Sequence, residues 1–415
     1  MSVGPRLKVL FLSQIVPYPP HGGVLQRGFH LIRELGRRAD VHLLAFIHPD
    51  VLPTETTLDE SRTVLQQFCT TVEYFPLWAK ASPIHKAAAI AASAGSREPF
   101  SMIAHRSAAF RRRIADAKRT TTFDVVHADT LALCQFVGGN GTPSVLTHHN
   151  IESMLMARRA DVESGLLARQ FLRRETAKLR AWEASESPRF DVNIVMSPQD
   201  ERILADQVPG VRTAIVPNGV NTEYFTPAPD EETPALIYTG GMNMFANRDA
   251  VMHFLGEVWP HIRAASPGVR FYAVGQDPPK ELTAFAASDP NVVVTGYVDD
   301  IRPYVRKAAV YVVPLRVGGG TRLKVLDAMA SGKAIVSTSI GCEGIDVKPG
   351  EHLVTADTPE TFARETLALL DDRARRRTLG GAARELVERR YAWAIVGNQL
   401  LDAYQAAIAN HRTSS

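Results

Sequence analysis

A glycine-rich segment followed by charged side chains is the stretch of this sequence best suited to binding chemistry. Its residues are Gly318, Gly319, Gly320, Thr321, Arg322, Lys324 and Asp327. The glycines let the backbone turn tightly and come close to a ligand. Thr321 is placed to cap a helix, and cations at a helix N-terminus oppose its dipole at a cost of a few tenths of a kcal/mol to about 1 kcal/mol. Because an anionic ligand removes that conflict, the pattern predicts a phosphate site held by two mobile cations, Arg322 and Lys324.

The neighbouring sequence places this segment between a strand and a helix. An apolar run at 308–313 precedes it, and Leu323, Leu326 and Ala330 follow it with helical spacing. Asp327, on the predicted helix, can accept hydrogen bonds from hydroxyls such as those of a ribose. The segment lacks the G-x-x-x-x-G-K-[ST] pattern of ATPase P-loops. An ordinary turn with solvated basic residues is the alternative interpretation.

A pair of histidines and a pair of glycines follow two other predicted strands. His148 and His149 come at the end of the apolar run 144–147, and Gly22 and Gly23 end the loop after the first strand. Ligands of open parallel sheets bind beyond the carboxyl ends of the strands, where a histidine can donate to a sugar hydroxyl or a phosphate oxygen. A structural histidine and a turn without a ligand are the alternatives.

The composition is that of a globular protein outside the membrane. The 415 residues are 45% apolar and 22% charged with a formal net charge of +3, which gives no argument for nucleic acid as a partner. The three cysteines have no C-x-x-C spacing, and no acidic cluster accompanies the histidines, so we predict neither a disulfide framework nor a metal site. We identify no signal peptide and no apolar run of about 18 residues, and therefore expect a cytoplasmic protein.

The order of the predicted elements indicates two α/β domains. In the first half, strands are predicted at 7–12, 41–46, 125–128, 144–147, 191–196 and 214–216. In the second half, they are predicted at 235–238, 269–274, 292–294, 308–313 and 334–337. Helical segments separate these strands, including one at 248–263. This rhythm predicts two doubly wound parallel sheets, with the ligand in the crevice at their carboxyl edges.

A proline- and acid-rich run without periodicity lies between the two halves. We therefore predict an N-terminal domain at 1–216, a linker at 217–234 and a C-terminal domain at 235–389, followed by the helical end of the chain at 390–415.

Two segments of the first half, within 111–119 and 154–186, are rich in arginine and lysine. Such faces are usually only solvated. A basic face can also bind an anionic membrane or a lipid pyrophosphate, so peripheral contact with the inner face of a membrane is a second interpretation.

Several motifs together resemble the family 4 retaining glycosyltransferases. They are Val216 to Asn221 before the proline-rich run of the linker, Gly296-Tyr297-Val298 followed by two aspartates, and Pro314 to Gly332. The resemblance covers essentially the whole chain. It implies the GT-B fold, in which two Rossmann-like domains face a central cleft and the C-terminal one holds a nucleotide diphosphate sugar. It also implies that the helix at 390–415 crosses back to the N-terminal domain.

The resemblance assigns roles within the glycine-rich segment. Asp327 matches the second acid of the family's Glu, seven residues, Glu motif, which binds the donor ribose. The first acid falls at Gly319 and is missing, so backbone N–H groups of Gly318 to Thr321 would replace its contact to the donor sugar. The family's usual Arg and Lys for the diphosphate are also missing after the first strand of the C-terminal domain. We infer that Arg322 and Lys324 take over that charge.

Residues elsewhere gain roles from the same resemblance. His149 becomes a contact to the donor sugar, and Gly22 and Gly23 are assigned to the diphosphate or the acceptor. Gly240 and Gly241 are assigned to the donor nucleotide, with Tyr297 and Val298 as candidate contacts to its base. The variant pattern resembles a subgroup linked to exopolysaccharide and cell-surface sugar assembly.

The implied reaction is transfer of a glycosyl group from a nucleotide diphosphate sugar to a hydroxyl of an acceptor sugar, lipid-linked glycan or small molecule. We expect retention of configuration, and neither cofactor nor metal, because the cations stabilise the leaving diphosphate. Three alternatives stay open. They are a nucleotide-sugar epimerase or hydrolase on the same fold, a non-catalytic nucleotide-sugar-binding protein, and an NAD-dependent oxidoreductase. The last lacks a convincing G-x-G-x-x-G after the first strand.

Overall fold

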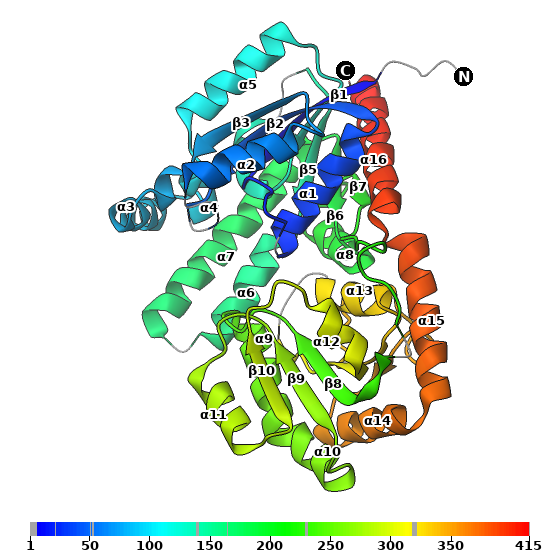
Figure 1. The fold of residues 1–415 in the computed structure, drawn as a ribbon. Helices are drawn as coiled ribbons and strands as arrows, with labels where there is room; N and C mark the ends of the chain where they lie inside the picture. Colours follow the sequence, from blue (N-terminus) through cyan, green and yellow to red (C-terminus); the bar gives the residue numbers. More distant parts are fainter. Residues whose placement is uncertain are drawn as a thin grey trace, which may run out of the picture. The chain divides into compact units, whose positions relative to one another are not determined.

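The computed structural model describes residues 6–20, 22–49, 51, 54–137, 141–163, 165–228, 231–317 and 322–414. The chain divides into two compact units, each built around a parallel sheet (Figure 1). The first unit comprises Met1–Pro217 and Val396–Ser415, and the second comprises Asn218–Ile395. The predicted fold class, two α/β domains with parallel sheets, is confirmed.

The described residues of the first unit form a seven-stranded sheet. In spatial order its strands are β3 (Thr71–Pro76), β2 (Ala39–Ile47), β1 (Leu7–Ser13), β4 (Val125–Ala128), β5 (Ser144–His148), β6 (Val192–Val195) and β7 (Thr213–Ile215). All pairings are parallel. Continuous apolar runs such as β1 and β4 are buried on both faces, which is typical of a doubly wound sheet. The strand order reverses between β1 and β4.

The helices of the first unit follow its strands. They are α1 (Gly23–Gly36), α2 (Glu55–Leu65), α3 (Pro83–Ala94), α4 (Phe100–Ala104), α5 (Ala108–Thr120), α6 (Glu152–Val162), α7 (Leu166–Glu186) and α8 (Pro198–Gln207). The arginine-rich stretch at 154–186 thus falls on two helices, α6 and α7. Strand β3 was not predicted, because it is an edge strand in which only Val72 is fully buried and the apolar signal is weak.

The second unit repeats the plan with six strands in its described residues. In spatial order they are β10 (Val292–Gly296), β9 (Arg270–Val274), β8 (Thr233–Thr239), β11 (Ala308–Val313), β12 (Ala334–Ser337) and β13 (Val354–Thr355). Here the order reverses between β8 and β11. Strand β11 has the predicted bounds, because its six residues are all buried.

The helices of the second unit are α9 (Phe245–His253), α10 (Trp259–Ala265), α11 (Lys280–Ser288), α12 (Arg302–Lys307), α13 (Leu323–Ala330), α14 (Pro359–Asp371) and α15 (Arg373–Arg390). The helix predicted at 248–263 is helical throughout, but it is not one regular α-helix, since a π-helical turn at Phe254–Val258 lies between α9 and α10. Pro260 has no N–H to continue the α-helical pattern, which accounts for the wider turn.

The chain between the two sheets packs against the second unit. The N–H of Val220 donates to the carbonyl of Tyr391 at 2.7 Å, and Phe225 is part of the buried core of the second unit. Strand β8 begins at Thr233. Residues 218–228 of the expected linker are therefore ordered parts of the second unit, because they pair with it and bury an aromatic ring in it.

The last helix, α16 (Trp393–Ser414), lies along the first unit from Val396 onward (Figure 1, red). Its side chains Val396, Leu400 and Tyr404 are fully buried. The Tyr404 hydroxyl lies 2.7 Å from Nδ1 of His127 on β4. None of the helices in the described ranges is both long and apolar enough to cross a membrane.

Replacing Tyr404 with Phe should lower the free energy of unfolding by about 1–3 kcal/mol, because Nδ1 of the buried His127 would lose its partner. Urea unfolding measures the change. The control is the same replacement at Tyr297, which is 63% exposed. Equal stabilities of the two variants would contradict a role of this hydrogen bond in docking α16.

Candidate functional site

The strand order identifies one position in each unit where a ligand is expected. In doubly wound sheets, ligands bind at the carboxyl edge where the order reverses. In the second unit, β8 and β11 lead there into residues 240–244 and 314–317. In the first unit, β1 and β4 lead into residues 14–20 and 129–130.

Lys324 is held at the reversal point of the second unit by side chains from β8 and α9. Its Nζ donates to Oη of Tyr238 and to Oδ1 of Asn247, both at 2.7 Å, and lies 4.0 Å from the centroid of the Tyr238 ring. Burial lowers the pKa of Lys324 well below its ordinary value, the charge of Arg322 lowers it further, and Asp327 opposes the shift. The expectation of a mobile cation is therefore wrong for Lys324, because its ammonium group is fixed by these contacts.

Because Gly240 has no side chain, there is room beside it for the Lys324 ammonium group. A Cβ at Gly240 would lie 2.6 Å from Nζ of Lys324 and 2.9 Å from Nδ2 of Asn247. The φ of Gly240 is +149°, which side chains rarely allow. The amide of Asn247 also donates to the carbonyl of Gly241 at 2.8 Å. The structure thus brings Gly240 and Gly241 together with Lys324.

Asp327 lies on α13 one turn beyond Lys324. Burial raises its pKa to about 7, and the nearby charge of Lys324 opposes the shift. Burial is the main cause of the raised pKa of Tyr311, and the charge of Asp327 raises it further. The Tyr311 hydroxyl forms a hydrogen bond with Thr239 at the end of β8. A carboxyl group in this position can accept hydrogen bonds from ligand hydroxyls in its ionised form.

Part of the glycine-rich segment lies outside the described residues. This holds for Gly318, Gly319, Gly320 and Thr321, so their expected contacts stay predictions. Helix α13 begins at Leu323 with Arg322 at the N-cap position. The expected cap by Thr321 is therefore wrong, because the helix starts one residue later than predicted. Upstream of these residues, Arg316 pairs with Asp249 on α9 at 2.6 Å.

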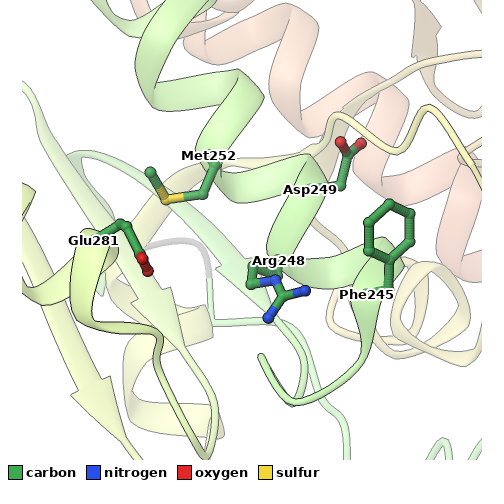
Figure 2. A pocket seen from close by; sticks show the side chains of 5 residues that line it. All are labelled: Phe245, Arg248, Asp249, Met252 and Glu281. Atoms are coloured by element: carbon green, nitrogen blue, oxygen red, sulfur yellow. The ribbon is translucent and has the colours of Figure 1, made fainter. Parts of the chain in front are cut away.

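A cavity of about 310 Å³ opens beside the same helix. Phe245, Arg248, Asp249 and Met252 line it from α9, and Glu281 lines it from α11 (Figure 2). None of these side chains was predicted as a site residue. The ion pair of Asp249 with Arg316 connects the cavity wall to the residues that directly follow β11.

Tyr297 and Val298 follow β10 and have different environments. The Tyr297 side chain is 63% exposed, whereas Val298 is partly buried and packs against the core of the second unit. Only Tyr297 therefore offers a side chain to a ligand such as a base, and Val298 could contribute only its backbone.

Gly22 and Gly23 form the start of α1 in the first unit. Gly22 is the N-cap residue with a φ of +92°, and a Cβ at this position would meet nothing within 4 Å. The helix start is therefore open at Gly22 on the side where a side chain would project.

The two adjacent histidines at the end of β5 also differ. His148 is 1% exposed, its Nε2 lies 3.0 Å from Oδ1 of Asn193, and burial lowers its pKa to about 4. The side chain of His149 is 12% exposed, and its Nε2 lies 3.4 Å from Oδ1 of Asp129. His148 is thus a core histidine, and His149 is the one that can reach a ligand.

Glu152, to which the sequence assigned no role, begins α6 next to this histidine. Its Oε1 accepts a hydrogen bond from Oγ1 of Thr130 at 3.2 Å. Burial raises the pKa of Glu152 to about 7, and the charge of Glu183 raises it further, whereas Thr130 and His149 oppose the shift. Glu183 in turn accepts hydrogen bonds from the N–H and the hydroxyl of Ser153.

Four residues at the two reversal points were not predicted: Asp129, Thr130, Tyr238 and Asn247. Asp129 and Thr130 directly follow the predicted strand 125–128, so the strand-end argument applied to His149 could have found them. Tyr238 and Asn247 carry no such signal, because their contacts depend on where α13 packs.

The profile of Glycosyltransferase Family 4 matches residues 21–224, and that of Glycosyl transferases group 1 matches residues 233–372. The chain belongs to glycosyltransferase family 4. The resemblance inferred from the motifs is therefore confirmed, and the two profiles meet close to the boundary between the two units.

A curated relative of this family 4 protein is the GDP-mannose-dependent monoacylated alpha-(1-6)-phosphatidylinositol monomannoside mannosyltransferase of Corynebacterium glutamicum. The two are 27% identical over 211 residues, which cover 46% of this chain and 55% of the relative. Matches to the curated relatives span between 36% and 55% of their lengths.

Solved structures share the fold over nearly the whole chain. Sucrose-phosphate synthase from Thermosynechococcus elongatus has a TM-score of 0.68 at 19% identity and covers 97% of this chain and 100% of its own. Anabaena HepE in complex with UDP and glucose has a TM-score of 0.63 at 13% identity and covers 96% of this chain and 99% of its own. These likenesses confirm the GT-B fold.

Replacing Glu152 with Gln should stabilise the protein by about 3 kcal/mol above pH 7 and leave stability unchanged near pH 4. The folded chain keeps the Glu152 proton up to about pH 7, whereas the unfolded chain loses it near the ordinary value of 4.5. The folded state therefore binds more protons in this window, and its stability falls as the pH rises through it. The glutamine of the variant does not titrate, so the stability of the variant does not fall in this window.

Urea unfolding of both proteins across this pH range measures the effect. Glu385→Gln, at a side chain that is 73% exposed, is the control and should show no such pH dependence. A Glu152→Gln effect of the same size at both ends of the range would contradict a buried, late-titrating carboxyl group.

Proposed function

We propose that this protein transfers a glycosyl group from a nucleotide diphosphate sugar to an acceptor hydroxyl. The observation that carries the proposal is the fixed Lys324 ammonium, with Arg322 at the adjacent helix cap, at the reversal point of the second unit. Mutual repulsion of the two cations contributes to the lowered pKa of Lys324. A diphosphate bound there would relieve this repulsion and complement the helix start.

The reaction uses these charges as the glycosidic bond breaks. The leaving diphosphate gains negative charge, and preorganised cations stabilise it more in the transition state than in the bound donor. One such contact is typically worth about 3–4 kcal/mol. Because the protein supplies this positive charge, we propose transfer without a metal ion. Retention of configuration is proposed from family membership.

The remaining predicted residues complete the donor site in this proposal. Asp327 accepts hydrogen bonds from the ribose hydroxyls, and Gly240 and Gly241 lie against the diphosphate. Tyr297 stacks on the base. His149 is the side chain that the first unit offers to the transferred sugar, and Gly22 belongs to the diphosphate or acceptor end.

The relatives suggest which donors to examine first. HepE binds UDP and UDP-glucose, and the Corynebacterium relative uses GDP-mannose and acts on a glycolipid. We therefore infer a UDP- or GDP-linked donor, with a sugar or lipid-linked glycan as acceptor. An epimerase or hydrolase on this fold would release altered free sugar, and a binding protein would form no product, so product analysis separates these alternatives.

A nucleotide panel tests the donor site directly. Saturating UDP, GDP, ADP or TDP, at about 100 times the dissociation constant, should stabilise the protein by about 2.7 kcal/mol for the base it uses. Lys324→Met keeps the aliphatic stem and should weaken this binding at least about tenfold, as should Arg322→Ala, because each removes one diphosphate charge. Thermal shift and calorimetric titration measure both effects.

Lys348→Met is the matched control, since this lysine is 72% exposed and pairs only with Glu351 in the described chain. It should bind the nucleotide as the wild type does. Wild-type affinity in both Lys324→Met and Arg322→Ala would remove the diphosphate assignment, and no stabilisation by any of the four nucleotides would remove the proposed donor class.

We propose in addition that the start of α7 contacts an anionic membrane. Leu166 and Leu167 are 78% and 85% exposed, and the exposed Arg173 and Arg174 follow each of them by seven residues, which places all four on one helix face. Apolar and basic side chains on one face are typical of interfacial helices. Two other side chains of the basic segments already form ion pairs within the protein, because Lys178 pairs with Glu175 and Arg113 pairs with Glu73.

Vesicle sedimentation tests this contact. The wild type should sediment with vesicles containing phosphatidylglycerol more than with pure phosphatidylcholine, and the double variant Leu166→Ser, Leu167→Ser should lose most of that binding. Ile84→Ser, at an 80% exposed site on α3, is the control. Binding by the double variant at the wild-type level would refute the assignment of the contact to α7.

A further inference from the structure

A buried carboxylate at the reversal point of the first unit lacks the hydrogen bonds that such a group normally makes. Asp129 is 1% exposed, and neither of its side-chain oxygens has a hydrogen-bond partner among the described residues. Its backbone N–H is used, donating to the carbonyl of Leu12 on β1. A buried charge without partners is expensive, so its persistence calls for compensation by a neighbour.

Two neighbours can supply that compensation. The guanidinium of Arg27 interacts favourably with Asp129 through its charge, and its pKa, lowered to about 10 by burial, leaves it charged at neutral pH. Two of the guanidinium nitrogens donate to the carbonyls of Val216 and Pro217. The close contact to the carboxylate is instead Nε2 of His149, at 3.4 Å from Oδ1, and that nitrogen also has no hydrogen-bond partner in the described part of the chain.

The other titratable groups near this pair are engaged elsewhere. His127 on β4 bonds Thr147 and Tyr404, and its pKa is lowered to about 4 by burial. His148 contacts Asn193, and Glu152 on α6 accepts from Thr130. In the described part of the chain, this leaves Asp129 and His149 to interact with each other.

We propose that Asp129 is the positioning residue for His149. Its carboxylate accepts the Nε2–H of His149, which fixes the ring and leaves Nδ1 to contact the substrate. The difference in exposure supports this division of roles, because the His149 side chain is 12% exposed and Asp129 only 1%. The inference rests on the proposed function in so far as the substrate is the transferred sugar, whereas the contact within the pair is independent of it.

Asp129→Asn tests the proposal, since it keeps the shape and removes the charge. With the donor and acceptor that the wild type uses, it should lower kcat by roughly 10- to 100-fold with little change in the donor KM, because a misplaced contact acts on the transition state. In a His149→Gln background the same substitution should cause no further loss, since Asp129 acts through His149. The matched control is Asp191→Asn, which removes a carboxylate 3.2 Å from Nδ1 of His411 in the same unit and should leave kcat unchanged.

NMR spectroscopy tests the contact between Asp129 and His149 even if no glycosyl transfer is found. In proton–nitrogen NMR, the Nε2–H of His149, assigned by its loss in His149→Gln, should be shifted downfield and slow to exchange in the wild type. In Asp129→Asn it should move upfield and exchange faster. An unchanged resonance, a wild-type kcat in Asp129→Asn, or a loss of equal size in the His149→Gln background would each overturn the proposal. If the wild type shows no turnover, that result would contradict the proposed function but not the contact between Asp129 and His149.

Discussion

The contact of the Lys324 ammonium with Tyr238 and Asn247 is the interaction on which the account of the second unit depends. It joins β8, α9 and α13 through one charged group. It also explains Gly240, because any Cβ there would collide with Nζ. In the proposed donor site, a lysine restrained in this way would lose little conformational entropy on binding a diphosphate, so more of the binding free energy would be available to stabilise developing charge.

The first unit is also a doubly wound sheet, but different charged groups lie at its reversal point. Its reversal point carries carboxyl groups, Asp129 and Glu152, beside a histidine that reaches the surface. The consecutive residues Asp129 and Thr130 contact His149 and Glu152 respectively. Cations thus mark the reversal point of one unit and acid–histidine contacts that of the other. The proposed function assigns the cations to the leaving group and His149 to the sugar.

The sequence was sufficient for what depends on local pattern. The buried strand at 308–313, the glycine turn after β8 and the family itself were all predicted, because fully buried parallel strands appear as continuous apolar runs and the motifs are local. Strand β3 was missed, since an edge strand is only half-buried. The fixed state of Lys324 and the role of Asn247 depend on strand order and on the packing of α13, which no local pattern contains. Asp129 differs from them, because it directly follows a predicted strand and could have been found by that position. The roles of His149, Asp327 and Tyr297 stay predictions.

The most direct measurement is a crystal structure of the protein with the nucleoside diphosphate that stabilises it. Our account predicts that phosphate oxygens lie within hydrogen-bond distance of Lys324 or Arg322 at the start of α13. A diphosphate bound elsewhere, with Lys324 still held only by Tyr238 and Asn247 and Arg322 making no phosphate contact, would contradict it.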